Sequence, residues 1–221
     1  MRSAELADGR LHICSAETRD IRRPDGLLDF LATLLHCPAD GISLTRDDFG
    51  RPVSARPPAD TDWPPDAGLF LAVGDDPDHR LVVLARDLPV ALSVHPVPRG
   101  PLGELLLPFT PLERESLRRA PAADRARQLT RLWVRKEAVL RLAGRGGLAA
   151  VDEIDALSGA GADDGTVRLP PALTDAGGAL GPVVHVRDLP VGPGWVACAA
   201  TPAPARGVRL WGANASGGAA T

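Results

Sequence analysis

A serine and a histidine, two residues apart, are the first pair in this chain whose types and spacing could do chemistry. The alternation of residues 90–97 predicts a strand with Ser93 and His95 on one face and Leu92 and Val94 on the other. An imidazole titrates near neutral pH, which suits general acid or base catalysis. Two interpretations of His95 stay open: an acid/base residue, or a histidine that belongs to the core or the surface.

A second group of ionisable residues falls on one predicted helix, residues 124–143. Glu137 and Arg141 are four residues apart, so a simple ion pair along the helix would also explain them. Lys136 is the only lysine among 25 Lys and Arg residues. It could form an exposed helix pair, or bury its stem beside Trp133 with its charge in water. One side of this helix is formed by Leu129, Leu132, Trp133, Lys136, Leu140 and Ala143.

Other elements must position these residues. The patterns predict a strand at 11–15, a helix at 26–36, and a mostly loop segment at 46–65. A three-stranded meander is expected at 69–73, 80–86 and 90–97, and further strands at 183–186, 195–200 and 208–211. Thr110, Pro111 and Glu113 predict a helix start with a capping box, and Gly144 predicts the end of the long helix. Residues 86–90 recur at 187–191, which indicates either two related halves or good turn sequences.

Composition excludes several classes of protein. The net charge of −3 argues against a general nucleic-acid binder. No apolar stretch approaches the roughly 20 residues that span a bilayer, and the N-terminus has no apolar signal core. The three cysteines are far apart, which favours buried thiols in a reducing cytoplasm. We therefore expect a cytoplasmic monomer that binds neither nucleic acid nor membrane.

Several motifs resemble one enzyme family. Residues 133–138 read Trp-Val-Arg-Lys-Glu-Ala, and Gly144-Arg145-Gly146 follows them. This stretch resembles the W-x-x-K-E-A helix and trailing G-x-G of 4'-phosphopantetheinyl transferases, of the larger pseudodimeric type that activates peptide and polyketide synthetases. Residues 48–52 and 109–113 are similar to that family's D-x-G-[KR]-P and F-[ST]-x-x-E segments.

The resemblance implies a fold and a reaction. It implies an α+β fold of two pseudo-symmetric halves, each a small, mainly antiparallel sheet packed with helices. We expect halves at 1–97 and 98–213 and a disordered tail at 214–221. Family members transfer phosphopantetheine from coenzyme A to a carrier-protein serine with Mg²⁺. Arg51 and Arg141 would then contact coenzyme A, and Glu137 would bind the metal.

The chain departs from the family where the metal binds. Ser93 and His95 stand where the family pattern has two metal-binding acids, and only Glu137 of the three remains. A hydroxyl and an imidazole bring no negative charge, and Mg²⁺ prefers carboxylates and water. Residues 70–74 contain no histidine for the coenzyme A phosphate. Asp75, Asp76 and Asp78 are either replacement metal ligands or an ordinary acidic turn.

Three functions are consistent with these motifs. The first is a repurposed enzyme of natural-product biosynthesis. His95, Glu137, Ser93 and Lys136 would catalyse metal-independent acid/base chemistry, such as cyclisation, dehydration or isomerisation, on a carrier-bound or released small molecule. The second is an active transferase that uses coenzyme A and a displaced Mg²⁺. The third is a non-catalytic module that binds an acyl or peptidyl carrier protein. The first interpretation needs no cofactor.

Overall fold

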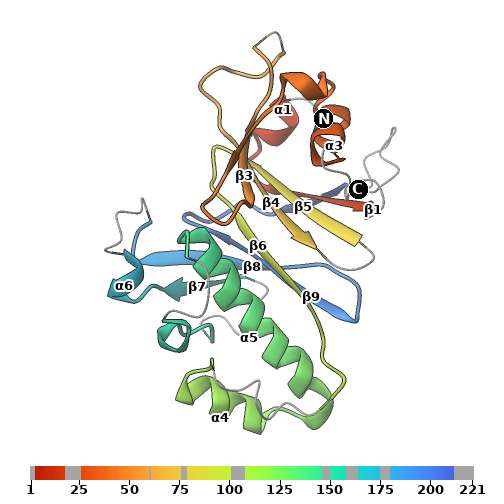
Figure 1. Cartoon of the computed structure of the whole chain (residues 1–221). Coiled ribbons are helices and arrows are strands. Elements are labelled where there is room, and N and C mark those ends of the chain that lie inside the picture. Colours follow the sequence, from red (N-terminus) through yellow and green to blue (C-terminus); the bar gives the residue numbers. More distant parts are fainter. Residues whose placement is uncertain are drawn as a thin grey trace. The chain divides into compact units, whose positions relative to one another are not determined.

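Two β-sheets with packed helices make up the described part of the chain, which has an α+β fold (Figure 1). The computed structural model describes residues 3–17, 26–59, 61–75, 79–100, 108–145, 150–157, 164–174 and 180–211. The chain divides into two compact units, Met1–Val90 with Ala205–Thr221, and Ala91–Pro204. Strand β6 (Ala91–Pro96) therefore belongs to the second unit, and strand β10 (Val208–Trp211) to the first.

The first unit contains a six-stranded sheet, counted over the described residues, with the order β10-β1-β5-β4-β3-β2. Its strands are β1 (Leu11–Glu17), β2 (Ser43–Arg46), β3 (Pro52–Arg56), β4 (Leu69–Asp75), β5 (His79–Arg86) and β10 (Val208–Trp211). All neighbours are antiparallel except β1 and β10, which are parallel. Among the described residues, the helices α1 (Ser3–Leu6) and α3 (Gly26–Leu35) precede the hairpins.

Helix α3 covers this sheet through leucines at helical spacing. Leu27, Leu31 and Leu35 are buried in one cluster with Leu71 of β4 and Leu84 of β5. Residues four apart lie on the same face of a helix, so one leucine stripe is enough to cover the strands. The helix ends where His36 adopts a positive φ of 56° just before Cys37-Pro38.

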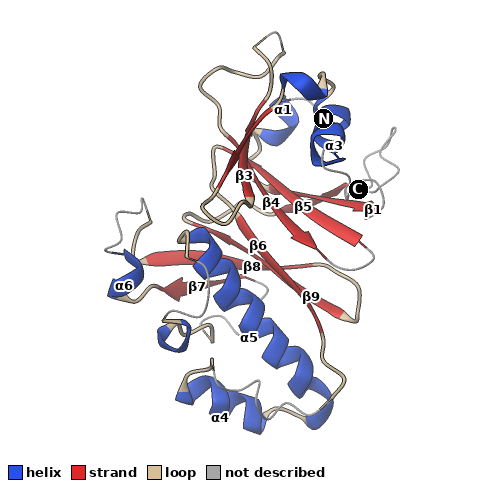
Figure 2. Ribbon diagram, viewed as in Figure 1, coloured by secondary structure: helices blue, strands red, loops and turns tan. Residues whose placement is uncertain are grey.

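The second unit contains a four-stranded antiparallel sheet in its described residues, with the order β6-β9-β8-β7 (Figure 2). Its strands are β6 (Ala91–Pro96), β7 (Asp164–Arg168), β8 (Val183–Leu189) and β9 (Trp195–Thr201). Its helices are α4 (Pro111–Arg119), α5 (Ala122–Leu142) and the short α6 (Pro171–Thr174). Short 3-10 turns occur at Ala39–Gly41 in the first unit and at Val151–Glu153 in the second.

Helix α5 packs against β9, β6 and β8. Val134 and Ala138 on its inner face are fully buried in the same cluster as Cys198 of β9. The buried Arg135 side chain donates from Nε and Nη2 to the two carboxylate oxygens of Asp188 on β8, at 2.9 and 3.0 Å. These two hydrogen bonds hold the helix against the sheet, and the carboxylate neutralises the buried guanidinium.

The predicted helix ends are confirmed. Thr110 Oγ1 accepts from the Glu113 backbone N–H at 3.2 Å, while the Glu113 carboxylate accepts from the Thr110 N–H at 2.8 Å. Gly144 follows α5 with a φ of 67°, in the left-handed region that favours glycine. Phe109 and Leu117 pack with Leu129 of α5, which joins the two helices.

The predicted three-stranded meander is wrong in its third strand. Strands β4 and β5 pair as expected, but β6 pairs with β9 in the other sheet. Strand β5 already has β4 on one edge and β1 on the other, so it has no free edge for β6. The chain leaves the first sheet at Asp87, whose backbone N–H and carboxylate bond back to Gly68 at 2.8 and 2.7 Å.

The segment expected to be mostly loop also contains structure. Within residues 46–65, β3 pairs with β2 as a hairpin. The Asp47 carboxylate closes its turn by accepting from the backbone N–H groups of Phe49 and Arg51, at 3.0 and 2.8 Å.

The boundary between the two units falls at Val90, before the expected boundary at Val97. The expected tail at 214–221 lies outside the described residues. No helix among the described residues is long and apolar enough to cross a membrane.

Candidate active site

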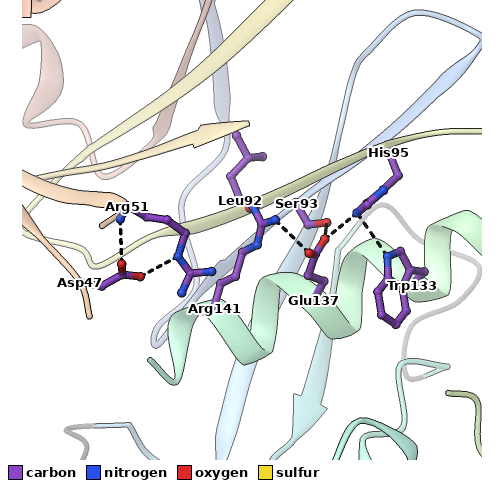
Figure 3. Close-up of polar contacts among 8 residues, drawn as sticks. All are labelled: Asp47, Arg51, Leu92, Ser93, His95, Trp133, Glu137 and Arg141. Carbon is purple, nitrogen blue, oxygen red and sulfur yellow. Dashed lines mark hydrogen bonds and ion pairs between the residues drawn. The ribbon is translucent and has the colours of Figure 1, made fainter. Parts of the chain in front are cut away.

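Strand β6 and helix α5 bring three of the expected site residues together (Figure 3). Ser93 and His95 share one face of β6, as their spacing predicted. Ser93 Oγ donates to Glu137 Oε2 at 2.5 Å, and His95 Nε2 lies 2.7 Å from the same oxygen. Ser93 is fully buried, whereas the His95 side chain is 37 % exposed. Solvent can therefore reach the imidazole within its own unit.

Arg141 holds the other oxygen of the same carboxylate. Its Nη2 donates to Glu137 Oε1 at 2.9 Å, and its Nη1 donates to the Leu92 carbonyl of β6 at 2.7 Å. Burial alone would raise the pKa of the Glu137 carboxyl. The His95 and Ser93 hydrogen bonds and the Arg141 charge outweigh it and lower the pKa from 4.5 to about 2. Glu137 is therefore a fixed anion at neutral pH.

Trp133 completes the group, although its sequence pattern indicated only a core residue. Its indole Nε1 lies 3.2 Å from His95 Nε2, and the two rings meet edge to face with centroids 6.2 Å apart. Trp133, Glu137 and Arg141 are spaced four residues apart, so they form one stripe along α5. That spacing was the signal in the sequence that could have added Trp133 to the site.

The second nitrogen of the partly exposed His95 ring is the position of this group that could exchange a proton with a bound molecule. Within the described residues, His95 Nδ1 has no hydrogen-bond partner, while Nε2 faces Glu137 and Trp133. An imidazole held by a carboxylate at one nitrogen can accept a proton at the other, and the anion then stabilises the imidazolium. The arrangement can therefore do acid/base chemistry.

Lys136 is not part of this site. Its side chain is fully buried and forms an ion pair with the equally buried Glu113 at 2.6 Å. Nζ also donates to the carbonyls of Pro108 and Val151, at 3.0 and 2.9 Å. Burial lowers the pKa of Lys136, and Glu113 opposes that shift. The expectation of an exposed ammonium is wrong, because Lys136 is buried and its ammonium is held by Glu113 and by the Pro108 and Val151 carbonyls.

Arg51 belongs to the first unit, where it pairs with Asp47 within the β2–β3 turn. Its Nε donates to Asp47 Oδ2 at 2.7 Å, and its guanidinium lies over the Phe49 ring, 5.0 Å from the centroid. Of the acidic turn considered as a replacement metal site, Asp76 and Asp78 lie outside the described residues. In the described part of the chain, no group of three or more His, Cys, Asp and Glu residues could hold a metal ion.

A second histidine group, which the sequence did not indicate, lies in the first unit. His12 is fully buried on β1, with Nε2 3.0 Å from Asp8 Oδ1. Trp211 of β10 donates from its indole Nε1 to His12 Nδ1 at 3.1 Å. Burial lowers the pKa of His12. Both ring nitrogens are occupied and the ring is inaccessible, so this group stabilises the β1–β10 pair.

Comparison with known proteins adds no family assignment. Neither protein-family models nor curated proteins match the chain.

Proposed function

We propose that this chain is a metal-independent acid/base enzyme of natural-product biosynthesis, built on a scaffold related to 4'-phosphopantetheinyl transferases. The observation that supports the proposal best is the contact of His95 Nε2 with Glu137 Oε2 at 2.7 Å. The carboxylate is held on both oxygens, and the imidazole is partly exposed. This is the arrangement that a general base with a supporting anion requires.

In the proposed reaction His95 Nδ1 removes a proton from the substrate. The electron pair of the broken bond stays on the substrate, and the proton converts the imidazole to an imidazolium. Glu137 stabilises that cation through Nε2, while Arg141 and Ser93 keep the carboxylate in place. Return of the proton to another substrate atom completes an isomerisation. In a dehydration the electron pair forms a C=C bond while a hydroxyl departs, takes the proton from the imidazolium and leaves as water. In a cyclisation the electron pair forms the ring bond by displacing a leaving group of the same substrate, and the leaving group takes the proton.

The residues present do not fit the Mg²⁺ of the resembling family. Both oxygens of Glu137 already accept hydrogen bonds, from Arg141 on one side and from Ser93 and His95 on the other. Mg²⁺ requires oxygen ligands, and a guanidinium 2.9 Å from the carboxylate would oppose a cation. No step of the proposed reaction passes through a metal.

The described residues also give little support for the binding of coenzyme A. Arg51 and Arg141, the expected phosphate ligands, each face a carboxylate in their own unit, at 2.7 and 2.9 Å. A phosphate would have to compete with Asp47 and Glu137 for these guanidinium groups. We therefore rank an active transferase second, and a non-catalytic carrier-binding module third.

The scaffold and partner are part of the proposal. We infer two related halves because each unit has a mainly antiparallel sheet packed with a helix, α3 in the first and α5 in the second. The motif around residues 133–138 supports the same ancestry. We propose a carrier-bound or released acyl or peptidyl compound as the substrate.

The experiment that tests this function does not require the final product. The protein is incubated in D₂O with carrier-bound and free β-keto thioesters, and mass spectrometry measures deuterium incorporation. Exchange should be catalysed by the wild type and lost in His95→Gln. The matched control is His185→Gln, a half-buried histidine on β8 of the same unit, which should retain it.

The competing functions predict different results. Incubation with coenzyme A, Mg²⁺ and apo carrier protein would add a phosphopantetheine mass to the carrier if the chain were a transferase. A Glu137-dependent mass gain would overturn the acid/base proposal. Carrier binding without any exchange would favour the non-catalytic module.

A further inference from the structure

The buried histidine of the first unit, His12, fits its two partners in only one protonation state. Trp211 of β10 donates from its indole Nε1 to His12 Nδ1 at 3.1 Å, and Asp8 Oδ1 lies 3.0 Å from Nε2. An indole nitrogen can only donate, so Nδ1 has to be the unprotonated nitrogen of the ring. Nε2 then carries the proton that Asp8 accepts. The contact with Trp211 therefore requires a neutral imidazole.

A second proton on His12 is incompatible with this contact. The proton would sit on Nδ1 and place an N–H group against the indole N–H of Trp211. The ring is fully buried, so no solvent offers Nδ1 another acceptor while β10 stays in place. A buried donor without an acceptor costs free energy, and a charged donor costs more. The closed arrangement of β1 and β10 therefore disfavours the imidazolium.

The charged groups that act on His12 come from the start of β1 and from β10. Asp8 would stabilise an imidazolium through Nε2, whereas Arg10 and Arg209 would repel it. The other elements contribute apolar residues, with Leu84 of β5 opposite His12 and leucines of α1 and α3 in the adjoining cluster. The Arg209 guanidinium also lies over the Trp211 ring, 4.5 Å from its centroid. Strand β10 therefore carries both the donor and one of the cations that oppose a charged His12.

Strand β10 is also the element that can leave at the lowest cost. It pairs in parallel with Leu11–Cys14 of β1, at the edge of the sheet. None of its four residues is buried, and Leu210 is 60 % exposed. Elements with few buried apolar contacts open locally before the rest of a structure. Separation of β10 would leave the β1–β5–β4 core of the sheet paired.

We propose that β10 is a pH-released strand: protonation of His12 breaks its contact with Trp211, and β10 separates from β1 while the rest of the first sheet stays folded. Separation admits water to Nδ1, so the open form binds the proton more tightly than the closed form. By linkage, acid then favours opening. Burial lowers the pKa of His12 in the closed form, so opening begins as the pH falls below about 6.5.

Release of β10 would change how the two units are connected. The chain passes between them at Val90–Ala91 and returns at Pro204–Ala205, shortly before β10. While β10 is paired, both crossings lead directly into the first sheet or out of it. Once β10 has separated, only the crossing after β5 remains anchored there. His12 would thus control the second connection between the units.

Hydrogen–deuterium exchange of the full chain tests the proposal. The amides of β10 should lose protection as the pH is lowered from about 7.5 to about 5, after correction for the intrinsic exchange rate. One proton changes the opening equilibrium by up to roughly 10-fold for each pH unit. The amides of β4 and β5 should stay protected over this range. The indole NMR signal of Trp211 should accordingly change at a higher pH than that of Trp63.

Two variants separate protonation from packing. His12→Gln cannot take up the proton, so the protection of β10 should no longer depend on pH. Asp8→Asn keeps an acceptor for Nε2 but removes the anion that stabilises the imidazolium, so β10 should open at a lower pH than in the wild type. The matched control, His185→Gln on β8, should open like the wild type.

Three results would overturn the proposal. The first is constant protection of β10 in the wild type over this pH range. The second is a wild-type pH dependence that persists in His12→Gln. The third is an equal loss of protection in β10, β4 and β5, which would mean that the first sheet opens as a whole and that β10 is not released separately.

Discussion

The ammonium group of Lys136 has three N–H donors, and the structure supplies three acceptors for them. These are the Glu113 carboxylate and the carbonyls of Pro108 and Val151, all within 3.0 Å. The ring of Phe109 lies 5.4 Å from Nζ. A planar guanidinium is larger and points its donors in other directions. This geometry gives a structural reason for the single lysine in an arginine-rich chain.

We predict that Lys136→Arg destabilises the protein by about 1–3 kcal/mol, because the larger head group overfills a closed site. Lys136→Met should cost more, about 3–5 kcal/mol, since it leaves the Glu113 carboxylate buried without its cation. Urea unfolding measures both. Arg119→Met, which removes an exposed ion pair with Glu115 on α4, is the control and should cost under about 1 kcal/mol. A wild-type midpoint for Lys136→Arg would contradict this explanation.

In the proposed reaction Glu137 acts through its negative charge, so a neutral residue of the same shape should separate the effect of charge from that of shape. Glu137→Gln should lower deuterium exchange roughly 100-fold or more, because the imidazolium loses its anion. Glu115→Gln, on the exposed part of α4, should retain the wild-type rate. Equal rates for both variants would mean that Glu137 only ties α5 to β6.

Side-chain alternation and helical spacing could predict the pairs within each element, and the family resemblance implied that the two pairs meet. They placed Ser93 with His95 on β6, and Glu137 with Arg141 on α5, and these four side chains do come together. Helical spacing placed Lys136 on one side of α5 with leucines that are buried, but it could not predict its ion pair, because the acceptors come from segments distant in sequence. The sequence pattern likewise could not predict that Glu137 and Trp133 both contact His95 Nε2, because those contacts depend on side-chain geometry.

At the scale of elements, the capping box at the start of α4 shares Glu113 with a group of buried hydrogen bonds. The Thr110 hydroxyl caps the helix, and Glu113, the other half of the capping box, also binds Lys136 and the Ala156 N–H. Thr110→Ala should destabilise the protein by about 1 kcal/mol. Ser116→Ala, inside the same helix, should change stability much less. Thermal unfolding compares them, and equal losses would argue against a capping role.

Local signals predicted helices better than strand pairing. The Thr110 cap and the Gly144 stop are each determined by a few adjacent residues, and both are confirmed. The partner of β6 depends on which edges other strands leave free. β1 occupies the second edge of β5, although the two are far apart in sequence. A period-two pattern carries no information about that choice, so the meander was predicted where the chain changes sheets.

At the scale of the whole molecule, the two units should respond to acid in different pH ranges. In the first unit, burial lowers the pKa of His12 below 6.5, while Asp8 raises it and Arg209 and Arg10 lower it. The unfolded chain therefore takes up this proton first, and stability falls as the pH drops below about 6.5. His12→Gln has no proton to take up, so it should remove this loss, whereas His185→Gln should not.

In the second unit, the pKa of Glu137 is lowered from 4.5 to about 2, so its contribution is present above pH 4.5 and is lost as the pH falls toward 2. The shift corresponds to a contribution to the free energy of unfolding on the order of 3 kcal/mol.

Each unit has two tryptophans, Trp63 and Trp211 in the first and Trp133 and Trp195 in the second. Their indole NMR signals can therefore follow the units separately during acid titration. We expect the first pair to change at higher pH than the second. The Glu137→Gln variant should lose the lower transition, and simultaneous changes of all four signals in the wild type would contradict separate acid responses.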